Sequence, residues 1–226
     1  MRVWRYVIAV DNGGAPNFEP PMTTLTVCKP RIRQQARRGD LVIAFNGAAL
    51  NRDEPHSVRW AGVVSEVIPL ADYWWDVRFR GKRPGQHGGE RRGGRPDNIY
   101  CPTADGRLER VENETHEQGA TGRDTGGVNA LVLERPWRFG SAVAVLPARF
   151  GLRIVGGRRG HRRSEIDEST WRELEEWLDE NNPGPGRQAT AIDSEAPCTP
   201  SKAARTQPSI HDDPAKPVKL PARRRC

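Results

Sequence analysis

The sequence is poor in lysine and cysteine and has no long apolar run. Only 5 of its 36 basic residues are lysines, so arginine supplies most of the positive charge. Its four cysteines show no paired CxxC spacing, which argues against a zinc site or a disulfide framework. No stretch approaches the roughly 20 apolar residues of a membrane span, and the N-terminus has no signal-peptide pattern. We therefore expect a cytoplasmic protein with no membrane partner and no metal site.

Motifs that mark the common nucleotide and hydrolase sites are also missing. There is no P-loop, no GxGxxG between a strand and a helix, no HExxH and no GxSxG. P-loop chemistry, dinucleotide binding, zinc proteolysis and α/β-hydrolase chemistry therefore lack support. The cofactor stays open, as do the reaction type, the oligomeric state and whether the chain is an enzyme.

Hydrophobic residues make up 35% of the chain, which is low for a fully globular protein. Residues 183–226 are rich in proline and contain no aromatic residue, so they predict a disordered basic tail after a single domain, 1–182. The domain carries 28 basic and 25 acidic residues, against 8 and 4 in the tail. A net charge of +3 on the domain is too small to indicate nucleic-acid binding, so that inference depends on local clusters.

Runs of β-branched and apolar residues predict strands at 3–10, 23–27, 41–45, 58–68 (bent at Gly62) and 130–133. Helical spacing predicts helices at 30–38, 70–79 and 164–181, the last of which should fray because its final turn is acidic. Residues 111–127 and 156–161 read as loops. The fold class expected is α+β, with a mostly antiparallel sheet that could close into a barrel and a C-terminal helix.

The stretch 23–47 joins a strand, a basic helix and a second strand with little slack. Lys29, Arg31, Arg33, Arg37 and Arg38 all fall on its short central element, where they would attract anions. Lys29 and Arg33 are four residues apart and are expected to project together from one helix face, where they could clamp a phosphate. The alternative is a solvated basic face without a ligand.

Polar residues at the ends of predicted strands are further candidates. Asp11 could be a general base or a turn residue. Asp97, Asn98 and Tyr100 could hydrogen-bond and stack on a base, or form a turn with Tyr100 in the core. Since Asp11 and Lys29 each follow a strand and Asp97 precedes one, we expect these three to converge at one rim of the sheet.

His161 lies near Arg159 and Arg162 in a basic segment, whose positive charges should lower the pKa of the imidazole and favour a neutral base. The alternative is an isolated surface histidine. The candidates for catalysis are Asp11, Lys29, Asp97 and His161. The candidates for nucleic-acid binding are Arg33, Asn98, Tyr100 and Arg159.

Five blocks in the same order resemble the second type of nucleotide-modification-associated domain, a family of bacteria and phages. They are DNGGAPNF at 11–18, CKPRIRQQARRGD at 28–40, DNIYCP at 97–102, RFG at 138–140 and RRGHR at 158–162. The resemblance covers nearly all of 1–178, and its most specific block is 28–40. It implies a role in modifying DNA bases or nucleotides, with nucleic acid (DNA more than RNA) or a nucleotide as the partner.

Two other interpretations stay open beside a modification protein. The chain could be a non-catalytic module that recognises a modified base in a cage of aromatic and polar groups. It could also be a basic structural partner in a larger complex. An enzyme should place two titratable groups within hydrogen-bond reach in one pocket, whereas a reader needs only stacking and polar contacts.

Overall fold

The computed structural model describes residues 1–9, 15–50, 54, 57–85, 95–113, 118–140, 142–153 and 160–182. The chain divides into two compact units, Met1–Ala191 and Ile192–Cys226, and all described residues belong to the first. The strands are β1 (Arg2–Ile8), β2 (Thr23–Leu25), β3 (Leu41–Asn46), β4 (Val58–Pro69), β5 (Tyr100–Pro102), β6 (Leu108–Arg110), β7 (Asn129–Arg138) and β8 (His161–Glu165). The α-helices are α1 (Pro30–Gln35), α2 (Leu70–Trp75), α3 (Thr121–Thr125) and α4 (Glu168–Asn181).

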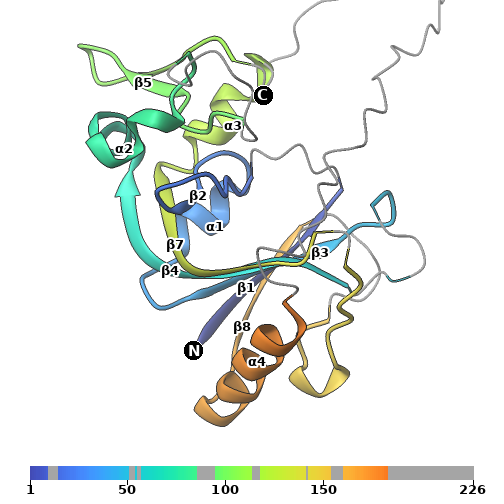
Figure 1. Cartoon of the computed structure of the whole chain (residues 1–226). Coiled ribbons are helices and arrows are strands. Elements are labelled where there is room, and N and C mark those ends of the chain that lie inside the picture. Colours follow the sequence, from blue (N-terminus) through green and yellow to red (C-terminus); the bar gives the residue numbers. More distant parts are fainter. Residues whose placement is uncertain are drawn as a thin grey trace, which may run out of the picture. The chain divides into compact units, whose positions relative to one another are not determined.

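Six strands form one mixed sheet in the order β2-β7-β4-β3-β1-β8 (Figure 1). Only β1 and β3 run parallel, and the other neighbouring pairs are antiparallel. The predicted α+β class with a mostly antiparallel sheet and a C-terminal helix is confirmed. The suggested barrel is not: β2 and β8 are the two ends of the sheet, and within the described residues it is open. Strands β5 and β6 form a separate hairpin.

The two faces of the sheet are covered by different helices. Along β3, Leu41, Ile43 and Phe45 belong to one buried cluster, whereas Val42 and Ala44 belong to another. This alternation follows from the two-residue period of a strand. Helix α4 covers the first face, and α1 covers the second with Ile32 and the adjoining Ala36 (Figure 1).

Strand β4 bends as the sequence predicted. Its register with β7 shifts between Ala61 and Val63 and again between Val64 and Glu66. A side chain at Gly62 would press on Leu133, with a Cβ only 3.3 Å from that residue. Such irregularities increase local twist, and β4 curves toward α2 (Figure 1).

Helix α4 begins later than predicted, because residues 161–165 form the edge strand β8 instead of its first turn. Asp167 caps the helix by accepting a hydrogen bond from the Thr170 amide at 2.8 Å, which lowers the pKa of this carboxyl to about 2. The acidic last turn is anchored, since Asp179 accepts a hydrogen bond from the Trp137 indole at 2.6 Å and pairs with Arg135 at 3.1 Å. These contacts of Asp179 with β7 stabilise the end of α4. They oppose the unfavourable interaction between acidic residues and the helix dipole, which was the reason to expect fraying.

Two further segments differ from expectation. Helix α1 ends at Gln35 and not near Gly39, which instead turns the chain into β3 with φ +85°. Part of the predicted loop 111–127 is helical, since α3 follows a short 3-10 turn, Gln118–Ala120. The proposed boundary at residue 182 stays a prediction, and the tail 183–226 lies outside the described residues.

Candidate functional site

The turn that joins β2 to α1 has an unusual backbone. Cys28 and Lys29 are consecutive residues in the left-handed region, with φ values of 58° and 44°. Neither is glycine, so each costs about 1 kcal/mol and persists only where the surroundings hold it. The Cys28 amide donates to Asp124 Oδ1 at 2.9 Å, and Arg33 Nε donates to the Cys28 carbonyl at 2.8 Å. The turn is therefore fixed from both α1 and α3.

Asp124 and Arg33 form the buried support of this turn. Both are fully buried, and the phenol of Tyr100 donates to Asp124 Oδ2 at 3.0 Å. The Arg33 guanidinium also donates to the carbonyls of Asn129 and Asp124. Burial lowers the pKa of Arg33 to about 10, although the Asp124 carboxylate opposes this change. Gly127 leaves room for the guanidinium, since a Cβ there would collide with it.

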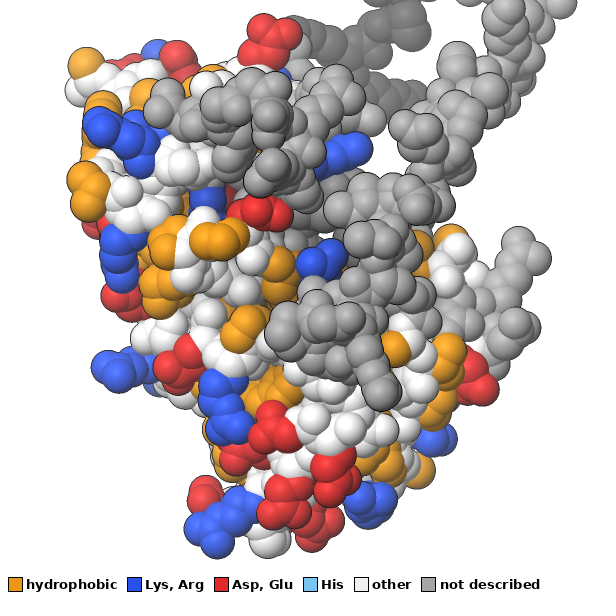
Figure 2. All heavy atoms as spheres, in the orientation of Figure 1, with side chains coloured by type: hydrophobic (Ala, Val, Ile, Leu, Met, Phe, Trp, Pro, Cys, Tyr) orange, Lys and Arg blue, Asp and Glu red, His pale blue; other side chains and the backbone are white. Residues whose placement is uncertain are grey.

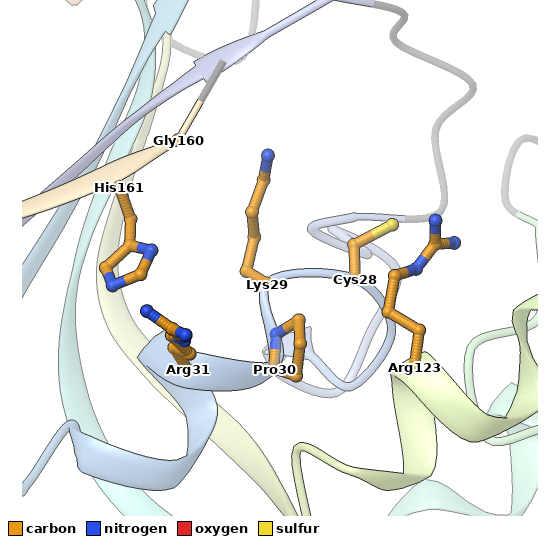
Figure 3. A pocket seen from close by; sticks show the side chains of 7 residues that line it. All are labelled: Cys28, Lys29, Pro30, Arg31, Arg123, Gly160 and His161. Carbon is orange, nitrogen blue, oxygen red and sulfur yellow. The ribbon is translucent and has the colours of Figure 1, made fainter. Parts of the chain in front are cut away.

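The same turn borders an open pocket of about 590 Å³, within the range of small-molecule sites. Figure 3 shows the Lys29 side chain rising in its middle, with His161 and Arg31 on one side and Cys28 and Arg123 on the other. No acidic side chain is among the described residues that line it. The pocket is therefore positive. Its lining residues are Cys28, Lys29, Pro30, Arg31, Arg123, Gly160 and His161.

Lys29 and His161 connect the pocket to the sheet. Lys29 Nζ lies 4.2 Å above the centre of the Tyr6 ring, a cation–π contact, and 3.5 Å from the Val7 carbonyl. His161 is paired with Tyr6 across β8 and β1, and its ring centre is 6.2 Å from that of Trp4. Burial lowers the pKa of His161, with smaller effects from Arg31 and Lys29. The expected direction is confirmed, but the contributing cations among the described residues are Arg31 and Lys29 rather than Arg162, and Arg159 lies outside the described residues.

An aromatic row continues from His161 across the sheet. The strand registers place His161, Tyr6, Ala44, Trp60 and Arg138 opposite one another on five neighbouring strands. Such residues share one face. The Tyr6 and Trp60 rings lie 5.9 Å apart and edge-on, and the buried Trp60 Nε1 has no hydrogen-bond partner among the described residues.

Comparison with known protein families assigns the chain to one of them. The model of nucleotide modification associated domain 2 matches residues 1–195. The chain belongs to this family. The family resemblance that the sequence blocks indicated is thereby confirmed. The described elements that border the pocket all fall within the matched residues. Membership associates the chain with nucleotide modification without specifying an activity. Neither a search of curated proteins nor a search of solved structures finds a match.

In this family member, Asp97 and Asn98 lie away from the pocket lining, in a buried polar cluster. Asp97 Oδ2 accepts a hydrogen bond from Thr24 Oγ1 at 2.7 Å and Oδ1 accepts one from Tyr73 at 3.1 Å. Burial raises the pKa of Asp97, although Lys82 and these hydrogen bonds oppose the change. The Asn98 amide donates to the carbonyls of Tyr73 and Phe79. These contacts fit the structural alternative for both residues, as burial beside Asp124 does for Tyr100.

The predicted pair of Lys29 and Arg33 is wrong in its geometry. Lys29 precedes α1 in a left-handed conformation, so the helical spacing of four residues does not apply to it. Arg33 is buried on backbone carbonyls, whereas Lys29 enters the pocket. Of the candidate residues in the described part of the chain, only Lys29 and His161 line the pocket. Asp11 and Arg159 lie outside the described residues. The predicted convergence of Asp11, Lys29 and Asp97 stays a prediction, although Asp97 does not line the pocket that Lys29 enters.

Five lining residues were not candidates in the sequence, and three of them carry a polar or charged side chain: Cys28, Arg31 and Arg123. Arg31 was noticed only as part of the basic helix. Arg123 belongs to α3, within a stretch that resembles a loop and carries no motif. No cluster of metal-ligating side chains occurs in the part of the chain that the structure describes, and no helix there is long and apolar enough to cross a bilayer.

Proposed function

We propose that this chain binds a phosphate group of a nucleotide or of DNA in its basic pocket, as part of nucleotide modification. The observation that carries the proposal is the meeting of Lys29, Arg31 and Arg123 with His161 in one cavity, with no acidic side chain among its described lining residues. Two guanidinium groups and an ammonium group favour a dianion or a polyanion. Family membership supplies the nucleotide context.

The pocket also offers a proton-transfer group. A histidine with a lowered pKa is neutral at pH 7 and can accept a proton, while neighbouring cations stabilise negative charge. In a modification reaction, His161 would act as the base and Lys29 would hold the charged group. Asp97 supports the fold behind the site in this proposal, and Asp11 stays a candidate second acid or base.

A module that recognises a modified base is the second candidate. The observation in its favour is the aromatic row that starts at His161, with the Trp60 indole N–H lacking a described acceptor. Analysis of nucleosides by mass spectrometry after incubation with DNA separates the two candidates, because a reader leaves every base unchanged.

Binding to a fluorescein-labelled DNA oligonucleotide at several salt concentrations tests the proposal. Lys29→Ala, Arg31→Ala and Arg123→Ala should each weaken binding about three- to tenfold and reduce the salt slope by about one unit. Arg172→Ala on α4 is the matched control, since this exposed arginine pairs only with Glu168 among described residues and should change little. Equal affinities for all four variants and the parent protein would refute the phosphate pocket.

A further inference from the structure

A second surface of interest lies at the end of α2, away from the lining of the basic pocket. Trp75 is 64% exposed, and Val77, which begins the following 3-10 helix Val77–Lys82, is 79% exposed. The rest of α2 is anchored: Leu70 and Tyr73 pack with Phe79 against β7. Trp75 is therefore a large aromatic side chain held in solvent on a fixed element.

Arginine side chains accompany this tryptophan. The Arg83 guanidinium lies 4.6 Å from the Trp74 ring centre and 5.8 Å from that of Trp75, and it donates to the Trp74 carbonyl. The buried Arg83 Nε has no hydrogen-bond partner among the described residues. Arg80 is exposed on the same 3-10 helix. Figure 2 shows hydrophobic and basic side chains side by side in the α2 region at the left of the view.

The sequence around this surface is strongly basic. Residues 77–96 contain seven basic residues and a single acidic one, Glu90. Two of the described basic residues have side-chain partners: Lys82 is buried on Asn17 Oδ1 at 3.0 Å, and Arg78 pairs with Glu66 and Asp76. Arg80 and Arg83 have no carboxylate partner among the described residues. Their guanidinium groups favour a polyanion over an apolar protein surface, which would have to desolvate them.

We infer that Trp75, with Arg80 and Arg83, is a stacking surface for single-stranded nucleic acid. An exposed indole offers its face to any unpaired base, and arginines beside it neutralise phosphates or extend the stack. A paired base in a duplex cannot present its face in this way. This surface is distinct from the phosphate pocket and would engage a longer strand, whereas a mononucleotide fits the pocket alone.

Anisotropy with fluorescein-labelled single-stranded oligothymidine tests the inference on the full chain. Trp75→Ala should weaken this binding about fivefold or more, because loss of one stacked base costs at least that factor. Trp75→Phe should retain most of the affinity, since a ring remains. Val143→Ala is the control, because Val143 is another exposed apolar residue, at 58%. The melting temperature of each variant should match that of the parent.

A titration with a nucleoside monophosphate distinguishes this surface from the pocket. Trp75→Ala should leave that affinity unchanged, whereas Lys29→Ala should lower it. If Trp75→Ala binds oligothymidine like the parent while Lys29→Ala is impaired, the stacking surface is refuted and the proposed function stands. Equal losses for single-stranded and duplex DNA would also refute stacking on unpaired bases. Loss of oligothymidine binding in Trp75→Ala alone supports the surface even if the pocket proposal fails.

Discussion

At the scale of single residues, charge in the sequence does not distinguish a ligand from a structural support. Arg33 and Lys29 look alike in a basic segment, yet Arg33 donates to three backbone carbonyls while Lys29 enters the pocket. The difference depends on carbonyls of residues 28, 124 and 129, most of which are distant in the sequence. The structural role of Asp97 also depends on residues distant in the sequence, because its carboxylate accepts hydrogen bonds from Thr24 and Tyr73. The lowered pKa of His161 was predictable from the sequence. Burial, which is the main cause of the lowered pKa, was not.

His161 makes the affinity for an anion depend on pH. Its pKa in the folded protein lies below the ordinary value of 6.5, so it contributes stability above that pH and loses it as pH falls through the folded pKa. A bound phosphate diester would raise this pKa and favour the imidazolium. Affinity should therefore increase as pH falls from 8 to 5.5, by up to about tenfold for each unit of pKa change on binding.

This pH dependence can be measured with an oligonucleotide that has no terminal phosphate, since its own charge is constant over that range. His161→Gln should flatten the profile while it leaves the affinity at pH 8 nearly unchanged. A parent protein whose affinity is the same at pH 5.5 and pH 8 contradicts a phosphate beside His161.

At the scale of elements, the pocket depends on a turn supported by a helix distant in sequence. The short β2 and α1 were predictable from Thr23–Leu25 and from Pro30, which suits a first helical turn. The left-handed pair Cys28 and Lys29 was not, because neither residue is glycine and the carboxylate that holds them comes from Asp124. Helix α3 itself is only five residues long and has no strong apolar periodicity.

Asp124→Asn tests this support. The amide keeps one acceptor for the Cys28 amide and Tyr100, so the Tyr100 bond must reverse its direction, and the carboxylate charge beside the buried Arg33 is lost. Stability should therefore fall by about 1–3 kcal/mol in urea unfolding. Phosphate affinity should also fall, because the Asp124 carboxylate holds the turn that carries Lys29.

Tyr100→Phe is the matched control for this variant. It removes the bond to Oδ2 alone and keeps the Cys28 contact, so it should lower stability by about 1 kcal/mol and preserve affinity. Unchanged affinity in a folded Asp124→Asn protein would show that the turn does not need this carboxylate to place Lys29.

At the scale of the whole molecule, apolar patterning was sufficient for the class of fold but not for its topology. The β-branched and apolar runs of β1, β3 and β4 indicated a sheet. Its mixed order follows from the parallel pairing of β1 with β3, a long-range contact that strand composition does not encode. The polar strand β8, HRRSE, lacked any strand signal, and it is the pairing of Tyr6 with His161 that brings this imidazole to the pocket.

Removal of the C-terminal region tests the predicted division of the chain. Residues 183–226 contain no aromatic residue and carry 8 basic against 4 acidic residues, so they cannot supply a core but can attract DNA. A protein ending at Asn182 should melt within a few degrees of the full chain, bind a nucleoside monophosphate equally well and bind long DNA more weakly at low salt. The family match extends to residue 195, which makes a protein ending there the control. A lower melting temperature only for the protein ending at Asn182 would move the domain boundary into 183–195. A lower melting temperature for both shortened proteins would show that the tail packs on the domain.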